Sequence, residues 1–349
     1  MNNMNDYDFL KKEQKNQTLI LVEGEHEKHI LLSILLACFP EIPILDENIH
    51  VYAADIYDLY HDIEKEYDED WYENEMEIDI PMLISRRYNI EPQLNKRNFT
   101  NIILMFDYEH HDIWFSDEKI IRMQKHFNSI SDDGILYINY PMIESYKDIV
   151  SIPDDTYFEK FISVQCQPGK SYKEKVEEKS IISKYFNTYD RLLRYLGEKI
   201  SESEEKDIPK LIYDIFSINE QENLRHQISN LLNTFVIEEK TRINMGYAIE
   251  RMIRQLLYLD EEISYWEKIR QIFIYIVGLN IEKGINVQRR FEESQDSVKE
   301  KYLALDWTQI LDEQNKASSD DNTGIIWILC TCVTILAEYK FYWNIRESS

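Results

Sequence analysis

Hydrophobic and polar positions alternate in two different ways along the chain. In the first part, short and mainly apolar runs follow polar segments, at residues 18–22, 49–53, 102–106 and 135–139. Runs of this kind are typical of strands buried on both faces in a parallel sheet. Between them, apolar residues recur at helical spacing, as in residues 25–39 and 117–128, with Ser116 as an N-cap for the second helix. Strand and helix alternate through about residue 150, which predicts an α/β fold with a parallel sheet flanked by helices.

Beyond residue 170 the pattern changes. From Tyr172 to Ile345, apolar residues recur at helical spacing, and no segment is a convincing strand. The 349 residues contain only 8 Gly and 8 Pro, which also favours long helices. We therefore predict an α/β domain over residues 1–165, followed by an all-helical domain over residues 170–349 for partner docking or oligomerisation, with the junction around Pro168-Gly169.

An apolar run at residues 324–337, GIIWILCTCVTILA, raises the question of a membrane segment. A spanning helix needs about 20 apolar residues, so we expect a buried helix, with a membrane anchor as the alternative. Residues 1–15 are polar and lack the apolar core of a secretory signal. The 4 cysteines form no CxxC pair, and Cys330 and Cys332 lie in the apolar run, as buried structural cysteines do. These features predict a cytoplasmic protein without a membrane segment.

The chain is strongly acidic. It has 65 Asp and Glu against 39 Lys and Arg, a net charge of −26. Such a protein repels nucleic acid on average, so a nucleic-acid enzyme would need bound metal ions and a local basic strip. Residues 62–79 are very acidic and aromatic. We expect an exposed helix or loop there, which is either a solvated face or a surface for a partner.

Carboxylates follow three of the predicted strands. Glu23 comes directly after the first strand, Asp107 directly after the third, and Glu144 a few residues after the fourth. Because ligands of parallel α/β sheets bind at the carboxyl ends of the strands, we expect these side chains to meet at one edge. Their repulsion would be costly unless a cation compensates it.

Local spacings extend this acidic set. Glu27 lies four residues after Glu23, across a strand-to-helix turn, and Glu109 lies two residues after Asp107. Alternate residues of an extended backbone point the same way, so Asp107 and Glu109 can reach one site. Gly24 leaves room for a metal ion or phosphate to approach the backbone. Clustered carboxylates without obligatory His or Cys suit Mg²⁺ or Mn²⁺.

Several of these residues have alternative interpretations. Glu27 is also an ordinary acidic residue in the first turn of a helix. Asp112 can substitute for Glu109 as a ligand. His26, His110 and His111 flank the acids, either as ligands or proton carriers or as residues without such a role.

The two acidic motifs together resemble the Toprim domain. The first is LILVEGEHE, and the second, IILMFDYE, follows about 80 residues later. The E-G-x-x-E and D-x-E forms are most similar to those of OLD-type nucleases and related anti-phage effectors. Topoisomerases and primases of this fold usually have Asp-x-Asp, so Glu109 departs from their pattern.

The segment YPMIESYKD resembles the stretch after the last Toprim strand in such nucleases. The resemblance, which covers roughly residues 15–160, implies that Glu144 helps to hold a second metal ion and that Lys147 contacts the scissile phosphate. It implies Glu23, Asp107 and Lys147 as catalytic residues. It implies as metal ligands Glu23, Glu27, Asp107, Glu109 and Glu144.

We therefore expect a nuclease that uses one or two Mg²⁺ or Mn²⁺ ions to hydrolyse DNA or RNA, as an effector in anti-phage defence. OLD-type proteins usually carry an ATPase domain, but this chain has no G-x-x-x-x-G-K-[ST] phosphate loop, so the ATPase would be a separate partner. A homo-oligomer is a further expectation. Strand-guiding charges would come from Arg251 and Arg254 or from Arg289 and Arg290, unless these are scattered helix charges. The alternative is a non-enzymatic defence or toxin-control protein whose acidic face binds a basic partner.

Overall fold

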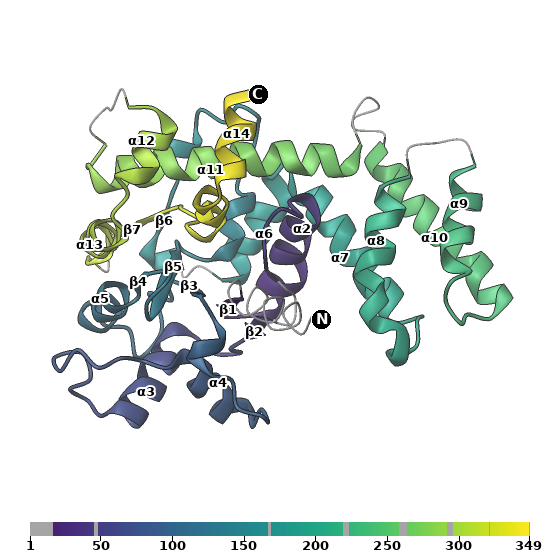
Figure 1. Ribbon diagram of the computed structural model, residues 1–349. Helices are drawn as coiled ribbons and strands as arrows, with labels where there is room; N and C mark the ends of the chain where they lie inside the picture. Colours follow the sequence, from purple (N-terminus) through teal and green to yellow (C-terminus); the bar gives the residue numbers. More distant parts are fainter. Residues whose placement is uncertain are drawn as a thin grey trace, which may run out of the picture.

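The computed structural model describes residues 17–44, 48–166, 169–218, 223–257, 264–291, 296–320 and 322–348. Its centre is a five-stranded sheet with the strand order β2-β1-β3-β5-β4 (Figure 1). The strands are β1 (Thr18–Val22), β2 (Ile49–Val51), β3 (Asn101–Asp107), β4 (Asn128–Ser129) and β5 (Gly134–Asn139). All are parallel except the short edge strand β4, which pairs antiparallel with β5. The predicted α/β class and all the predicted strands are therefore confirmed.

The strand predictions differ from the structure mainly at the ends of the strands. The predicted strand at residues 49–53 stops at Val51, and Ala53 has a left-handed backbone with a φ of 53°. Strand β4 was not predicted because a two-residue strand has no periodicity to detect.

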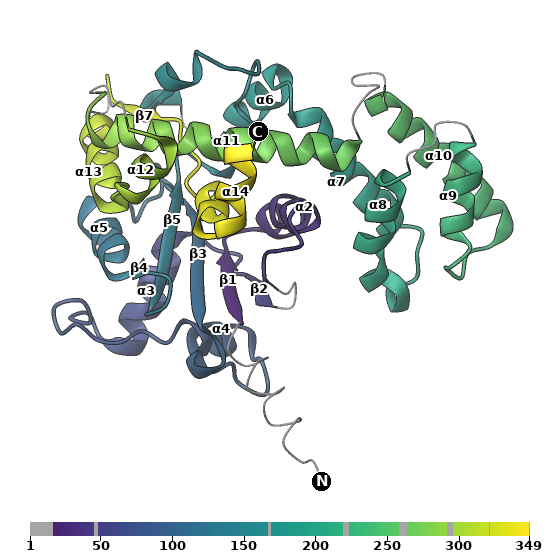
Figure 2. The ribbon, with the colours of Figure 1, turned by 45° about the horizontal axis from the view of Figure 1, so that its top comes forward.

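Helices cover both faces of the sheet. A π-helical turn, η1 (Glu27–Leu32), continues as α2 (Ser33–Cys38) on one face, while α3 (Ile56–Tyr67), α4 (Ile80–Tyr88) and α5 (Asp117–His126) lie on the other (Figures 1 and 2). The predicted N-cap of α5 is confirmed, since the Ser116 hydroxyl accepts a hydrogen bond from the Lys119 backbone N–H at 3.4 Å.

The acidic segment 62–79 is only partly exposed. Helix α3 ends within it, and the loop that follows exposes its acidic side chains, Asp68, Glu69, Asp70, Glu73 and Glu75. Trp71 in the same loop is 0% exposed, and its ring packs against Tyr60 and His126. The prediction of an exposed segment therefore holds for the carboxylates and is wrong for Trp71, which anchors the loop to the core.

The second half of the chain is mostly helical. Its helices are α6 (Lys170–Lys179), α7 (Ser183–Gly197), α8 (Ile208–Phe216), α9 (Leu224–Leu232), α10 (Glu239–Leu257), α11 (Tyr265–Gln288), α12 (Val298–Leu303), α13 (Trp307–Ser318) and α14 (Lys340–Ser348). Helices α7 to α10 form an arm at the side of the molecule, and the long helix α11 runs back from this arm across the face of the sheet that α2 covers (Figures 1 and 2).

The prediction that residues 170–349 are all helical is wrong at one place. Strand β7 (Ile325–Trp327) pairs antiparallel with β6 (Phe161–Ser163), and Leu329 forms a backbone bridge with Tyr140. The extended backbone is held locally as well, because the Gln314 amide bonds both the N–H and the C=O of Trp327, at 3.0 and 2.9 Å.

The apolar run 324–337 is buried, as predicted, but it contains no α-helix. After β7 it continues into a 3₁₀ helix, η8 (Cys332–Glu338). Adjacent β-branched residues Ile325 and Ile326 favour the extended start. Within the described residues, no helix is both long enough and apolar enough to cross a bilayer. Three thiols, those of Cys38, Cys330 and Cys332, are buried and unbridged.

Two sequence predictions fall outside the described residues. These are the expectations for residues 1–15 and for Pro168 at the predicted domain junction. The division into two domains stays a prediction. The pairing of β6 with β7 joins chain segments from the two sides of that junction.

Candidate metal centre

Three carboxylates meet at the carboxyl edge of the sheet. Strands β1 and β3 are neighbours in parallel register, with Val22 opposite Met105. Glu23 follows β1 and its backbone N–H donates to the Met105 carbonyl at 3.1 Å, while Asp107 is the last residue of β3. One carboxylate oxygen from each of Glu23, Asp107 and Glu109 lies within 4.8 Å of the others. The predicted convergence of these three residues is present in the fold.

The geometry of this group leaves a buried oxygen available. A carboxylate oxygen of Glu23, Oε2, accepts a hydrogen bond from the Asp107 backbone N–H at 2.9 Å, which fixes the Glu23 side chain. Asp107 is 6% exposed, and its Oδ1 is buried without a hydrogen-bond partner. A buried carboxylate oxygen in this state is costly unless a ligand satisfies it.

Glu109 reaches the group in a different way from the one predicted. The prediction assumed an extended backbone, but β3 ends at Asp107, and Glu109 has a left-handed φ of 43°. The turn after the strand, rather than strand alternation, directs its side chain toward Glu23 and Asp107.

Glu27 lies in the π-helical turn η1 and is 5% exposed. Its Oε2 accepts a hydrogen bond from the Gly24 backbone N–H at 3.1 Å. A Cβ atom on Gly24 would also lie 3.1 Å from this oxygen, so the glycine makes room for the Glu27 carboxylate. The expected role of Gly24, room for a metal ion or phosphate, stays a prediction beside this contact with Glu27. Short π-helical turns occur often at functional sites.

Glu144 lies in a 3₁₀ turn after β5, η4 (Ile143–Lys147), and is 5% exposed. Its Oε1 is paired with the ammonium of Lys173 at 3.0 Å, and its Oε2 is buried without a hydrogen-bond partner. Lys173 belongs to α6, and half of its side chain is exposed. Sequence reasoning missed this lysine because nothing distinguishes it from its neighbours in a polar helical segment.

Burial and mutual repulsion raise the pKa values in this cluster. Burial, with smaller contributions from the charges of Glu109 and Glu27, raises the pKa of Glu23 to about 8, although the hydrogen bond from the Asp107 backbone lowers it. Burial and, to a smaller extent, the charge of Glu23 raise the pKa of Asp107 well above its usual range. The pKa values of Glu27 and Glu109 are raised as well, again mainly by burial. Burial lowers the pKa of Lys173, but the charge and hydrogen bond of Glu144, together with the charges of Asp107 and Glu27, raise the pKa overall. Sites that hold protons in this way can hold a cation instead.

Lys147 and His26 lie beside the carboxylates but are engaged elsewhere. Lys147 is 2% exposed and its ammonium pairs with Glu177 at 3.0 Å. The predicted contact of Lys147 with a phosphate therefore stays a prediction and requires this pair to open. His26 Nε2 lies 3.4 Å from the Tyr146 hydroxyl. Burial, followed by the charges of Lys147 and Lys173, lowers the pKa of His26 to about 3, so the ring is neutral at pH 7.

The other acid and histidines near Glu109 have structural contacts. Asp112 Oδ1 accepts a hydrogen bond from the Trp114 backbone N–H at 2.6 Å, which closes a turn, and Asp112 is not in the group of three. The His110 ring packs against Phe115 with the ring centroids 4.6 Å apart. His111 is exposed.

Asp55, which the sequence reasoning did not single out, lies at the same edge of the sheet. It follows β2 and caps α3, since its Oδ1 accepts hydrogen bonds from the backbone N–H groups of Tyr57 and Asp58 at 2.8 and 2.9 Å. Burial is the main cause of the raised pKa of Glu109, and the negative charge of Asp55 raises this pKa further. A strand followed by an acidic residue was the signal available for it.

The donor set fits a hard divalent cation. Glu23, Asp107 and Glu109 offer only carboxylate oxygens, which are the ligands that Mg²⁺ and Mn²⁺ prefer. Such an ion would coordinate the buried oxygens of Asp107 and Glu144 that have no hydrogen-bond partner.

Comparisons of the chain with family models, curated proteins and solved structures find no match.

Proposed function

We propose that this protein is a hydrolase that cleaves phosphodiester bonds in DNA or RNA with one or two Mg²⁺ or Mn²⁺ ions. The observation that carries the proposal is the approach of Glu23, Asp107 and Glu109 to within 4.8 Å of one another, with a buried oxygen of Asp107 left without a partner. Crowded, buried carboxylates with raised pKa values are costly to ionise in the folded protein, so the arrangement is better explained by a ligand than by stability.

Glu23, Asp107 and Glu109 would hold one cation. Glu27 and Glu144 would hold a second cation, and the contribution of both charges to the raised pKa of Asp107 supports this. Bound divalent ions supply charge neutralisation for the scissile phosphate and lower the pKa of water.

The protein's own cations would then guide the substrate. The Lys173 ammonium, half exposed beside Glu144, offers an approaching phosphate a positive charge. His26 is neutral at pH 7 because its pKa is lowered to about 3 by burial and the nearby lysines, so it would add no positive charge beside the substrate. Lys147 would contact the phosphate once its pair with Glu177 opens.

The test is metal-dependent cleavage of tRNA, single-stranded and plasmid substrates by the full chain. We expect cleavage with Mg²⁺ or Mn²⁺, none in EDTA, and a loss of at least about a hundredfold in Glu23→Gln and Asp107→Asn. Glu118→Gln, an exposed acid on α5, is the matched control and should cleave like the wild type. Absence of cleavage of all substrates, or equal cleavage by Asp107→Asn, would refute the proposal.

The biological setting that we propose is anti-phage defence with a separate ATPase partner. It rests on the resemblance of LILVEGEHE and IILMFDYE to Toprim motifs of OLD-type nucleases. The helical arm of α7 to α10 would dock that partner or a second copy of the chain. Co-expression with a candidate ATPase should change the cleavage rate, and deletion of the arm, residues 183–257, which leaves α6 and Lys173 in place, should abolish this effect.

A second candidate function is non-enzymatic binding of a basic partner by the acidic loop. The acidic loop, residues 68–75, is anchored by the buried Trp71, and the carboxylates of the loop are exposed to solvent. The net charge of −26 favours a basic ligand. Neutralising Glu69, Asp70 and Glu73 together should weaken binding of a basic peptide, whereas Glu23→Gln should not. The opposite pattern would exclude this function.

A further inference from the structure

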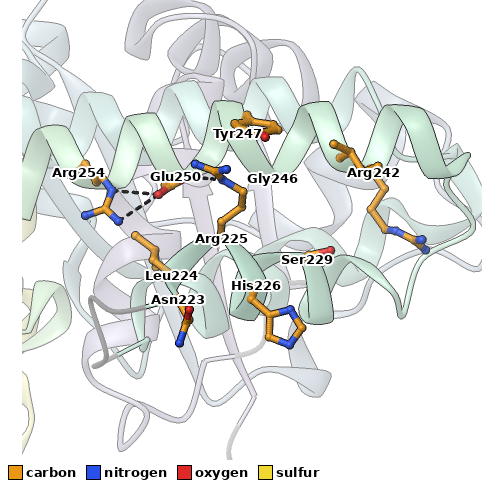
Figure 3. A pocket seen from close by; sticks show the side chains of 11 residues that line it. Asn223, Leu224, Arg225, His226, Ser229, Arg242, Gly246, Tyr247, Glu250 and Arg254 are labelled. Atoms are coloured by element: carbon orange, nitrogen blue, oxygen red, sulfur yellow. Dashed lines mark hydrogen bonds and ion pairs between the residues drawn. The ribbon is translucent and has the colours of Figure 1, made fainter.

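A groove lies between α9 and α10, on the arm and away from the sheet (Figures 1 and 3). Its volume is about 470 Å³, within the range of about 300–1,000 Å³ that small-molecule sites occupy. We call it the α9–α10 groove, and its polar and aromatic lining includes Arg225, His226, Arg242, Tyr247, Glu250 and Arg254.

The local charge is opposite to that of the whole protein. Residues 223–257 contain five Lys or Arg and three Glu, a net charge of +2, whereas the whole chain has −26. Three of the five cations, Arg225, Arg242 and Arg254, line the groove. A positive surface concentrated on an acidic molecule attracts anions to that one place.

One carboxylate holds two of the arginines in position. Glu250 accepts hydrogen bonds from Arg225 Nε at 2.6 Å and from Arg254 Nε at 3.0 Å, from opposite sides (Figure 3). The side chains of Arg225 and Arg254 are still 49% and 41% exposed. A guanidinium has five N–H donors, so most of those on Arg225 are directed elsewhere than Glu250. The single negative charge of Glu250 neutralises only one of the two arginine charges. Its hydrogen bonds hold both guanidinium groups in position to bind an anion.

An aromatic ring lies beside these cations. The Arg225 guanidinium carbon lies 3.9 Å from the centroid of the Tyr247 ring, and Tyr247 is 52% exposed. Ile243, one turn earlier on α10, is 50% exposed and also lines the groove. Phosphate-binding cations with an exposed aromatic ring are the elements by which proteins hold unpaired nucleotides.

We propose that the α9–α10 groove binds single-stranded nucleic acid, with phosphates on Arg225, Arg242 and Arg254 and a base on Tyr247. An acidic peptide would use the arginines but not the part of the Tyr247 ring that Arg225 leaves exposed, so the observations favour nucleic acid. The inference rests on the proposed function for the identity of the substrate. It adds a second contact with that substrate, remote from the carboxylates.

The test measures binding of labelled single-stranded DNA and RNA to the full chain by fluorescence anisotropy, in EDTA so that no cleavage occurs. Binding should weaken with salt, and Arg225→Ala with Arg242→Ala should lower the slope of log Kd against log salt by about 1.4, about 0.7 per phosphate contact. Tyr247→Ala should weaken binding by about tenfold, while Tyr247→Phe should bind like the wild type. Arg191→Ala, an exposed arginine on α7 outside the groove, is the control.

The outcomes separate this inference from the proposed function. Asp107→Asn should lose cleavage and keep oligonucleotide binding, and the groove variants should lose binding even if no cleavage is ever found. Two results overturn the inference: oligonucleotide binding by the wild type that is independent of salt or equal in all groove variants, or polyglutamate that binds more tightly than the oligonucleotide. Circular dichroism of each variant confirms that the loss is not due to unfolding.

Discussion

The Glu23 side chain is bonded to the backbone of Asp107, with 2.9 Å between Glu23 Oε2 and the Asp107 nitrogen. This bond joins the ends of two neighbouring strands through a carboxylate that also belongs to the candidate metal centre. A glutamine can accept the same hydrogen bond without the negative charge. Glu23→Gln therefore separates the charge of Glu23 from its structural contact.

The stability of the metal-free protein should depend on pH through Glu23. Burial raises the Glu23 pKa from 4.5 to about 8, so between these values the folded state binds the proton more tightly than the unfolded chain does. Stability in EDTA should fall as the pH rises from about 4.5 to about 8, and the penalty should be absent below that window because both states are protonated. Melting temperatures in EDTA across this window should show the fall, and Glu23→Gln should flatten it.

Divalent metal should reverse that trend, since it binds the native site only. At pH 8, Mn²⁺ should raise the melting temperature of the wild-type protein, and it should raise that of Glu23→Gln much less. A mutant that melts lower than the wild type in EDTA, or that gains as much from Mn²⁺, would make Glu23 a structural residue.

Asp107 should dominate metal affinity. Its buried Oδ1 has no other partner, so Asp107→Asn should weaken Mn²⁺ binding at least tenfold, about 1.4 kcal/mol. Isothermal titration calorimetry measures this directly, with Glu118→Gln as the control. Unchanged affinity in Asp107→Asn would remove Asp107 from the ligand set.

We expect Lys173 to contact a phosphate of the substrate and not to contribute to metal binding. Its ammonium neutralises part of the Glu144 charge, so Lys173→Ala should bind Mn²⁺ more tightly and cleave about tenfold more slowly. Lys175→Ala, on the same helix and exposed, should change neither property. Weaker metal binding in Lys173→Ala would contradict this assignment.

Trp71 should carry much of the stability of the acidic loop. Its side chain is 0% exposed, and truncation of a buried Trp to Ala costs about 3–5 kcal/mol. Denaturant unfolding of Trp71→Ala should show a loss of this size, whereas Glu73→Ala, exposed in the same loop, should be nearly neutral. A small loss in Trp71→Ala would mean that the loop is not anchored by this ring.

The parts of the fold that could be predicted are those with a strong local signal. Strands β1, β3 and β5 are buried on both faces, and their apolar runs are visible without any knowledge of their partners. Strand β7 has only three residues and is extended because it pairs with β6 and with the Gln314 amide. Such contacts join residues far apart in the chain and leave no periodicity to detect.

The candidate site could likewise be predicted where the signal is local, and not where it depends on contacts between residues far apart in the chain. Glu23 and Asp107 were predictable because each directly follows a strand whose carboxyl end defines the edge of the sheet. Lys173 comes from a helix beyond that sheet and reaches Glu144 only through the packing of α6. The contact of Gly24 with Glu27 could not be predicted, because the sequence does not show that the Glu27 carboxylate would fold back onto the Gly24 N–H group.

The bridge between Tyr140 and Leu329 has a consequence for the time at which the site is completed. Tyr140 and Leu329 exchange backbone hydrogen bonds of 2.8 Å, and beside them Cys330 Sγ contacts Asn139 Oδ1, a contact between residues 191 positions apart. Asn139 lies opposite Asp107 in the sheet. During translation, all the carboxylates leave the ribosome long before the segment that braces the strand beside them. We therefore expect an unfinished chain to contain all the acidic residues before it contains the segment that braces the strand beside them.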